Sequence, residues 1–416
     1  MSEDRPPAYE PFPHPPVSLE GSDRAAVSGL TPAQRRRGLV AVLASLLAAG
    51  LTFGTSIPLL ALLLERQGVS TTLIGLNSSM PLLATILMST ATPWIVRRFG
   101  VIRTLIAGIA LIIVCFLLMA AYRQLEAWFV LRFLIGVGMS VHWVVSETWL
   151  NSVAKPSNRG LFAGLYTALM GIGFAGGPAL LTVVPLDGWA PFLAIVCFIA
   201  LAGVAILSAS GCAPDLSLSH ESSRWSAIRL APTIFAAIFV SGLVDTAMLS
   251  LLPIYGLRHG VDQAQAVMML SVAVAGTVVL QAPLGWLTDK TNRRALLLGV
   301  GAVGLVGALL LPLVLQAGWL LWPVLFLWGG TVAGLYTVAL AELGARFEGG
   351  SLAAANALFV MTYCVGSLLG PSAAGAAMDG LGPDGFIWVV ALVLAVFLAL
   401  GGLRTALRGP TPSDKG

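Results

Sequence analysis

The sequence has little charge and few residues of the kinds that bind metals or form disulfides. Lys, Arg, Asp and Glu make up 10% of the 416 residues, and there are four histidines and four cysteines. The cysteines are scattered without metal-binding or redox spacing, so we predict no metal site, no cofactor and no disulfide. No Gly-x-x-x-x-Gly-Lys-Ser/Thr loop is present, which argues against an ATP-driven pump, and nothing in the sequence indicates an enzyme. The cysteines are Cys115, Cys197, Cys212 and Cys364.

Apolar residues dominate instead. With 57% hydrophobic residues and 46 glycines, the chain carries more apolar surface than an ordinary soluble domain can bury, so we expect a lipid bilayer around it. A helix needs about 20 apolar residues to cross roughly 30 Å of hydrocarbon. Unpaired backbone groups are costly in lipid, so the crossings are predicted to be helices. Twelve spans are predicted: 38–64, 73–96, 104–122, 127–150, 160–184, 189–210, 231–256, 264–287, 295–316, 319–343, 351–376 and 385–407.

The positive charges predict the orientation of these spans. If the amino terminus is cytoplasmic, all but four of the 23 lysines and arginines lie on the cytoplasmic side. We therefore expect both termini to be cytoplasmic, in a bacterial inner membrane. The net charge of +4 is explained by this bias and gives no reason to expect nucleic acid as a partner. The exceptions are Arg66, Arg123 and Arg258 on the other side, and Arg132 within a span.

Tails and a central loop divide the chain into two bundles. Residues 1–37 are rich in Pro, Ser and charge and are expected to form a disordered cytoplasmic tail. Six-helix bundles are expected at 38–210 and 231–407. The cytoplasmic loop between them, 211–230, could lie on the membrane surface or be a plain linker. Residues 408–416 form a second tail.

The two halves repeat one another at an offset of 192 to 195 positions, and parallel halves of this kind are typical of secondary transporters. The repeated Gly-x-x-x-Gly-Pro runs have a mechanical interpretation, because small residues allow close helix approach and prolines permit bending. The matches are Gly50-Leu51 with Gly242-Leu243, Arg66-Gln67-Gly68-Val69 with Arg258-His259-Gly260-Val261, Gly173-x-x-x-Gly177-Pro178 with Gly366-x-x-x-Gly370-Pro371, and Glu147 with Glu342.

Two loops carry a family resemblance. The loop after helix eight reads Gly285-Trp286-Leu287-Thr288-Asp289-Lys290-Thr291-Asn292-Arg293-Arg294. It resembles the Gly-x-Leu-x-Asp-Arg-x-Gly-x-Arg signature of the major facilitator superfamily. The loop after helix two, Arg97-Arg98-Phe99-Gly100-Val101-Ile102-Arg103, occupies the matching place in the first half. There Pro93 and Arg97 stand where the family has Gly and Asp.

Helix four extends the resemblance. Arg132-x-x-x-Gly136 resembles the arginine motif of the family. The run Glu147-Thr148-Trp149-Leu150-Asn151 resembles a Glu-Ser-Trp-Leu-Asn run in a bacterial branch of transporters with poorly defined substrates, and Gly375-Ala376-Ala377-Met378-Asp379 is also similar to that branch. The resemblance implies two pseudo-symmetric six-helix bundles, with helices one, four, seven and ten around a central cavity.

Asp245, near the middle of helix seven, is the sharpest candidate for a substrate or proton site. Its counterpart in helix one is Thr52, so the duplicated scaffold does not require a carboxylate there. The alternative is a carboxyl kept neutral by desolvation and hydrogen-bonded to a neighbour. Arg132 costs about 2.5 to 3.5 kcal/mol within a span, so we expect it to face the bundle interior with a partner, unless it snorkels to water.

Three further side chains near the cavity have a functional and a structural interpretation. His142 titrates in the physiological range and could relay protons, or be a neutral, satisfied histidine. Trp143 and Trp328 could line the cavity and stack on a ring-bearing solute, or pack between helices.

Carboxylates at the inner helix ends predict a latch. Glu147 and Glu342 are expected to pair with the basic loops while the inner mouth is closed and to release them as it opens. Proton coupling is the alternative, and Glu342 could instead be satisfied by Arg346 at i+4. The loop residues of this latch are Arg97, Arg98, Arg103, Asp289, Lys290, Arg293 and Arg294.

The sequence thus predicts a monomeric secondary active transporter for a small organic solute, coupled to protons. The Gly173–Pro178 run partly resembles the superfamily's antiporter signature and favours export, although Ala179-Leu180-Leu181-Thr182 lacks the glycine pair that should follow. The rival is a non-transporting membrane sensor or scaffold that retained the fold, with the tail or central loop as its partner site.

Overall fold

The computed structural model describes residues 31–153, 159–213, 228, 230–347 and 349–408. Twelve long helices make up the described chain, together with two 3₁₀ turns, η1 (Ser210–Cys212) and η2 (Gly318–Leu320). The first-half helices are α2 (Pro32–Arg66), α3 (Thr71–Phe99), α4 (Val101–Ala121), α5 (Leu125–Val153), α6 (Arg159–Leu180) and α7 (Ala190–Ser208). The second-half helices are α9 (Pro232–Arg258), α10 (Gln263–Lys290), α11 (Arg293–Val314), α12 (Leu321–Arg346), α13 (Gly349–Leu381) and α14 (Gly385–Arg408).

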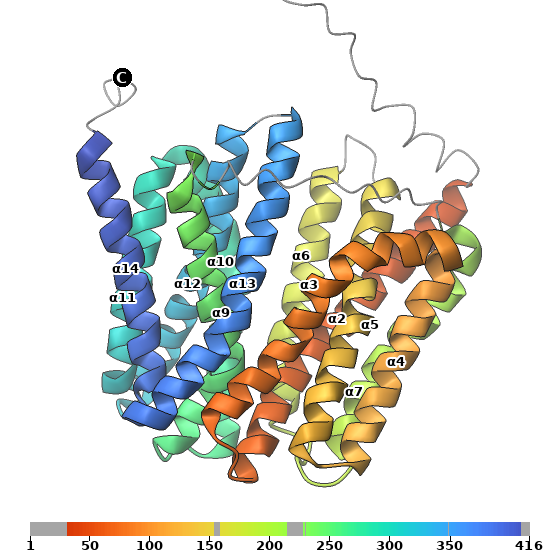
Figure 1. The fold of residues 1–416 in the computed structure, drawn as a ribbon, viewed down its shortest axis with the longest axis horizontal. Coiled ribbons are helices and arrows are strands. Elements are labelled where there is room, and N and C mark those ends of the chain that lie inside the picture. The colour runs from red at the N-terminus through yellow and green to blue at the C-terminus, as the bar shows by residue number, and fades with distance from the viewer. Residues whose placement is uncertain (1–30, 154–158, 214–227, 229, 348, 409–416) are drawn as a thin grey trace, which may run out of the picture.

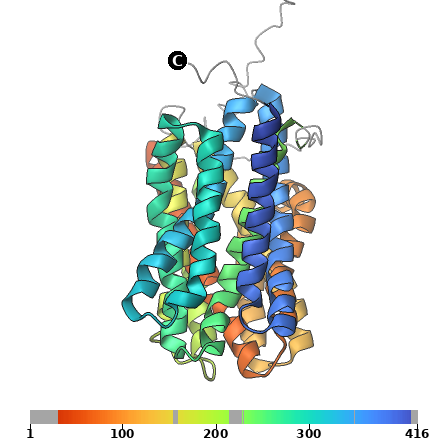
Figure 2. The same ribbon diagram turned by 90° about the vertical axis from the view of Figure 1, so that its left-hand side faces the viewer.

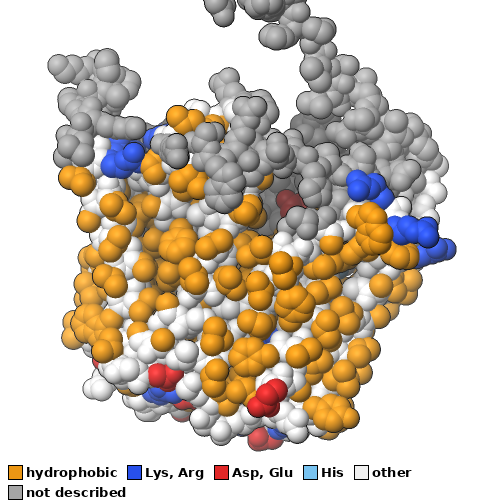
Figure 3. Space-filling model, in the orientation of Figure 1, with side chains coloured by type: hydrophobic (Ala, Val, Ile, Leu, Met, Phe, Trp, Pro, Cys, Tyr) orange, Lys and Arg blue, Asp and Glu red, His pale blue; other side chains and the backbone are white. Residues whose placement is uncertain are grey.

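These helices confirm the predicted all-helical fold of two bundles. Eleven of them contain a segment long and apolar enough to cross a membrane, and α6 contains a shorter apolar run, Ala168–Leu180. In Figure 1 the bundle of α2 to α7 stands on the right and that of α9 to α14 on the left, and Figure 2 shows the second bundle from its outer side. Figure 3 shows a nearly continuous hydrophobic band across the visible face of both bundles, as a bilayer requires.

The first helix begins earlier than the sequence predicted. Residues 32–37, which were assigned to the tail, are helical because Thr31 forms a capping box with Gln34. The Gln34 side chain accepts a hydrogen bond from the Thr31 N–H at 2.9 Å, and the Thr31 hydroxyl accepts one from the Gln34 N–H at 3.3 Å. The rest of the predicted tail, residues 1–30, and most of the central loop lie outside the described residues.

Both described ends of the chain lie at the same end of the molecule, uppermost in Figure 1. We call this end, where α2 begins and α14 stops, the terminal face. The other end carries the turns at 66–71 and 258–263 and is called the opposite face. Figure 3 shows a recess that opens at the terminal face between the bundles, with an acidic side chain inside it.

Glycine permits the closest helix contacts within each bundle. The Gly173 run of α6 lies against α2, where a Cβ atom at Gly173 would be 2.7 Å from the carbonyl carbon of Gly50. The Gly366 run of α13 lies against α9, where a Cβ atom at Gly370 would overlap the carbonyl oxygen of Leu243. Each repeated run therefore holds its helix against the first helix of its own bundle. Pro178 and Pro371 lie inside these two helices.

Contacts between the bundles run along α3 with α13, α6 with α10 and α2 with α9. Glycine also permits the contact between α3 and α13, since a Cβ atom at Gly75 of α3 would overlap the backbone of Pro371 in α13. The Ser79 hydroxyl donates to the Leu368 carbonyl oxygen at 2.7 Å in the same interface. The central helices α2 and α9 are the most buried of the spans, at 78% each.

Candidate functional site

Partly exposed side chains on the central helices identify the surface of the opening between the bundles. From residue 52 to 64 of α2 every residue is buried except Phe53 and Ile57. From residue 240 to 256 of α9 every residue is buried except Asp245 and Leu249. Each of these helices contacts five or more others, so partial exposure at mid-length indicates an internal opening rather than lipid. The two pairs are related by the offset of 192 found in the sequence.

This register corrects the predicted counterpart of Asp245, which is Phe53 and not Thr52. A Cβ atom at Gly50 would be 2.9 Å from the Met170 carbonyl oxygen, and one at Gly242 would overlap that of Tyr363, which is equivalent to Met170 in the repeat. Asp245 follows Gly242 by three residues, as Phe53 follows Gly50. Thr52 is buried, and its hydroxyl bonds to its own helix, at the Ala48 carbonyl oxygen, at 2.8 Å. Adjacent residues of an α-helix point in directions about 100° apart, so Thr52 and Phe53 face different sides of α2.

Asp245 has only neutral hydroxyl partners. Its Oδ2 atom accepts hydrogen bonds from Ser241 at 3.2 Å and from the Tyr363 hydroxyl at 3.5 Å. Its Oδ1 atom is buried and forms no hydrogen bond with any residue that the structure describes. No lysine, arginine or histidine of the described chain forms an ion pair with it. This oxygen is therefore available to a hydrogen-bond donor, a proton or a cation.

Aromatic side chains surround Phe53 on the first bundle. Its ring stacks on Phe174 of α6, with centroids 6.0 Å apart, and meets Trp143 of α5 edge-on at 6.2 Å. Trp143 is 37% exposed, which agrees with a position at the opening. We call Phe53, Trp143 and Phe174 the aromatic wall.

Phenols stand beside Asp245 on the second bundle. Tyr363 of α13 meets Tyr336 of α12 edge-on, with ring centroids 5.6 Å apart. We call Asp245, Tyr336 and Tyr363 the acidic wall. Trp328 does not belong to the acidic wall, because it is 1% exposed and packs edge-on against Phe386. This is the packing alternative that the sequence left open for Trp328.

Arg132 and His142 lie inside the first bundle, away from the opening. Arg132 is 1% exposed, so it does not snorkel, and its Nε atom donates to Asn77 of α3 at 3.3 Å. The sequence predicts a partner for Arg132 but not which residue it is, and the structure identifies Asn77. His142 is 2% exposed, and its ring lies near the Ser45 backbone although neither ring nitrogen forms a hydrogen bond with a residue of the described chain.

The carboxylates of the predicted latch are unequal. Glu342 bonds to Arg346 one turn later, with Nε at 2.9 Å, which is the i+4 alternative. Glu147 is exposed and lies within electrostatic range of the Tyr336 hydroxyl in the other bundle, but it forms no ion pair with a described residue. The recess is open at this face, whereas the latch is predicted for the closed state, so the latch stays a prediction.

The basic loops of the latch lie at the terminal face. Arg293 connects its loop to α12, donating to the carbonyl oxygens of Thr288 at 3.2 Å and Ala341 at 3.5 Å. The Asp289 side chain lies outside the described part of the chain. Two of the six loop cations, Arg293 and Arg294, are partly exposed, and the other four are exposed: Arg97, Arg98, Arg103 and Lys290.

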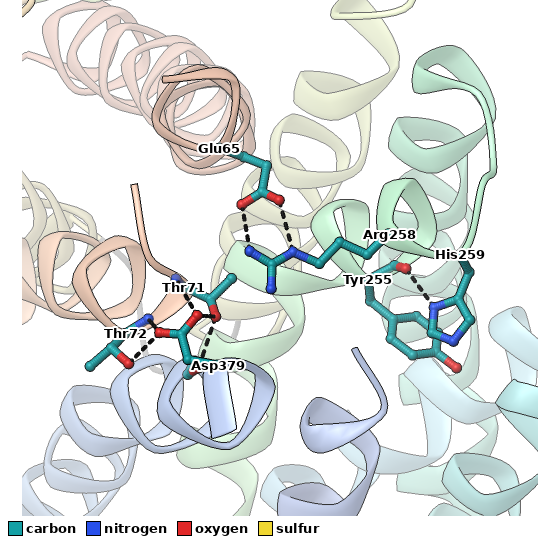
Figure 4. Close-up of polar contacts among 8 residues, drawn as sticks. Glu65, Thr71, Thr72, Tyr255, Arg258, His259 and Asp379 are labelled. Carbon is teal, nitrogen blue, oxygen red and sulfur yellow. Dashed lines mark hydrogen bonds and ion pairs between the residues drawn. The ribbon is translucent and has the colours of Figure 1, made fainter. Parts of the chain in front are cut away.

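At the opposite face, Asp379 joins the two bundles in a way that the sequence did not predict (Figure 4). Its carboxylate, on α13, accepts the backbone N–H groups of Thr71 and Thr72 at 3.0 and 2.8 Å and both of their hydroxyls at 2.6 Å. Thr71 and Thr72 begin α3, where free N–H groups and the helix dipole favour an anion. Asp379 therefore caps a helix of the other bundle.

A second link across this face is an ion pair. Arg258, at the end of α9, donates to both carboxylate oxygens of Glu65 in α2, at 2.8 and 3.1 Å (Figure 4). Arg66, the repeat counterpart of Arg258, pairs with Asp187 at 3.0 Å and also contacts Gln263 of the second bundle. We call the Asp379 cap and the Glu65–Arg258 pair the clasp.

The sequence held one signal of the clasp. Arg66 and Arg258 are repeated cations on the side that otherwise has few, so a functional partner was a reasonable expectation. Their partners could not be found, because Glu65 and Arg258 are 193 positions apart and Thr71 and Asp379 are 308 apart.

Comparisons with known proteins agree with this architecture. A family model described as Major Facilitator Superfamily matches residues 42–347. The chain is 26% identical over 362 residues to the uncharacterized MFS-type transporter YfkF of Bacillus subtilis (strain 168), covering 85% of this chain and 92% of that protein. It is 28% identical over 382 residues to the uncharacterized MFS-type transporter YcaD of Escherichia coli (strain SE11), covering 90% of this chain and 98% of that protein.

Two solved structures are similar in fold. A bacterial homolog to the human lysosomal transporter Spinster, in an inward-facing and unoccupied conformation, has a TM-score of 0.74 at 14% identity, covering 92% of this chain and 100% of that one. The nucleoside transporter NupG has a TM-score of 0.69 at 12% identity, covering 88% of this chain and 98% of that one.

Proposed function

The chain belongs to the Major Facilitator Superfamily and is a membrane transporter, and we propose that it carries a small organic solute by secondary active transport, coupled to protons at Asp245. One observation carries the proposal: Asp245 is partly exposed at the internal opening, halfway along a central helix, and only neutral hydroxyls bond to it. An acidic side chain inside a membrane is costly and typically marks an ion or substrate pathway. Its repeat counterpart Phe53 shows that the scaffold itself does not require the charge.

Alternating access supplies the mechanism. The recess is open at the terminal face, while the clasp joins the bundles at the opposite face. Rocking of the two bundles around a site at the depth of Asp245 would break the clasp and open the opposite face. It would also close the terminal face, where Glu147 would pair with the basic loops as the latch. Transport then requires that protonation or solute binding at Asp245 changes the relative stability of these two states.

The cationic loops favour a cytoplasmic terminal face, in a bacterial inner membrane, so the described state is proposed to be open to the cytoplasm. The Spinster homolog, which has a similar fold, is in an inward-facing conformation, and this agrees with the assignment. The Gly173–Pro178 run, by its partial resemblance to the antiporter signature, favours export. We propose that a single chain is the transporting unit, because one chain contains both walls of the opening.

The test is proton flux in liposomes that contain the purified protein and a pH-sensitive dye. Sugars, amino acids, organic acids, nucleosides and hydrophobic drugs are added in turn, and one class is expected to drive proton movement. Asp245→Asn, which keeps the size of the side chain, should abolish that flux, whereas Asp384→Asn at the opposite face should preserve it. Equal solute-driven proton flux in the Asp245→Asn protein would remove this residue from the coupling.

A further inference from the structure

We infer that the solute is a ring-bearing organic cation, bound between the Asp245 carboxylate and the aromatic wall, and that it exchanges there with a proton. This inference rests on the proposed function and assigns its substrate class. It follows from the charge of the opening, the aromatic side chains at the equivalent position of the first bundle, and the partner that the carboxylate lacks.

The charges at the opening are negative among the described residues. Asp245 lies midway along it and Glu147 lies toward the terminal face, and neither pairs with a cation of the described chain. The two nearby basic side chains of the first bundle, Arg132 and His142, are 1% and 2% exposed and do not reach the opening. Two carboxylates along a recess with low-dielectric walls concentrate cations and exclude anions. Organic acids and phosphate esters are therefore unsuited to this site.

The side chains at the repeat position of Asp245 in the first bundle suit a cation with a ring. Phe53 stands at the repeat position of Asp245, and it adjoins Phe174 and the exposed Trp143. Aromatic faces attract cations, tryptophan most strongly, and they also stack on flat solutes. The duplicated scaffold thus presents a carboxylate on one wall and aromatic rings at the equivalent position of the other. An apolar pocket with one charged group that fixes orientation is the usual form of a small-molecule site.

The missing partner of Asp245 accounts for coupling. Its buried Oδ1 atom has no hydrogen-bond partner among the described residues, so either a proton or a cationic group of the solute can bind to it. One carboxylate cannot hold both, so a monovalent cation enters as one proton leaves, and the net charge of the site stays constant. The ionisable groups near Asp245 are Tyr363 of α13 and Tyr336 of α12, with Cys364 of α13 and Glu147 of α5 beyond them. Phenols and thiols are mostly neutral near pH 7, so the exchange is assigned to the Asp245 carboxylate.

The experiment compares three water-soluble probes on the full-length protein in lipid nanodiscs. They are benzyltrimethylammonium, phenylmethanesulfonate with the same ring and opposite charge, and tetramethylammonium with the same charge and no ring. Apparent affinities come from the dependence of the unfolding temperature on probe concentration, since binding to the folded state alone raises it. We expect benzyltrimethylammonium to bind about tenfold or more tightly than either control, and its affinity to fall as the pH is lowered.

Asp245→Asn should reduce benzyltrimethylammonium binding about tenfold and remove its pH dependence. Trp143→Leu should weaken benzyltrimethylammonium more than tetramethylammonium. Equal binding of the cation and the sulfonate by the unaltered protein would overturn the inference without any variant, as would unchanged cation affinity in folded Asp245→Asn. No binding of benzyltrimethylammonium, with proton flux driven by another solute class, would refute the cation assignment and leave the transport proposal intact. Cation binding without any cation-driven proton flux would instead refute the coupling.

Discussion

The clasp gives the sharpest conformational prediction, and Asp379→Ala is the perturbation. This substitution removes all four hydrogen bonds that the carboxylate accepts from Thr71 and Thr72. Loss of the two backbone N–H bonds at the start of α3, which keeps Ser70 as its own N-cap, costs about 1 kcal/mol. Loss of the Thr72 hydroxyl bond adds about 1 kcal/mol at this partly solvated position, while the Thr71 hydroxyl can still donate to the Gly375 carbonyl oxygen at 2.8 Å. The alanine protein should therefore favour opening of the opposite face by about 2 kcal/mol, a population change of about 30-fold.

The assay is a distance measurement between spin labels across the opposite face. Labels at Gln124→Cys and Gln316→Cys lie in exposed turns of the first and second bundle, in a protein whose native cysteines are replaced by alanine. We expect Asp379→Ala to add a longer-distance population. The matched control is Asp384→Asn, because Asp384 at the same face pairs with His259 at 3.1 Å and accepts from Tyr255 at 3.3 Å within the second bundle only.

The reasoning would be refuted if the folded Asp379→Ala protein kept the distance distribution of the unaltered protein. A shift of equal size in Asp384→Asn would also count against it, because the effect would then reflect general loss of negative charge at this face rather than a lost contact between bundles.

Two further predictions concern contacts in the fold. Arg258→Glu alone should open the opposite face in the same assay, because it places two carboxylates together. Adding Glu65→Arg should restore the distances of the unaltered protein. If the exchanged pair fails to restore them, the Glu65–Arg258 contact does not set the closed state. Gly370→Ala should lower the free energy of unfolding by about 1–3 kcal/mol in a thermal unfolding measurement, because its Cβ atom would overlap the Leu243 carbonyl oxygen. The control is Gly299→Ala, which should be neutral or stabilising because a Cβ atom there meets nothing within 4 Å. Equal melting temperatures of the two variants would contradict the packing argument.

The clasp and the aromatic wall show where sequence reasoning stops. The Glu65–Arg258 pair joins residues 193 positions apart, and no local period relates them. Phe53 does not stand out in the sequence, because phenylalanine is common in apolar spans; its partial exposure, which matches that of Asp245, distinguishes it only in the structure. The repeat offset varies from 192 to 195, so the sequence does not separate Thr52 from Phe53, although these neighbouring positions differ by about 100° around the helix.

The sequence by itself determined the spans, the duplication and the small-residue contacts of Gly173 and Gly366, because hydrophobic length, repeat register and side-chain volume are properties of short segments. It also singled out Asp245 and Arg132, since a charged residue in an apolar span is conspicuous whatever surrounds it. Only the tertiary structure decided that Asn77 partners Arg132, that Trp328 packs in the core and that Asp379 caps a helix of the other bundle. These outcomes depend on the rotation and depth of helices relative to one another, which are set by packing among many chain segments at once.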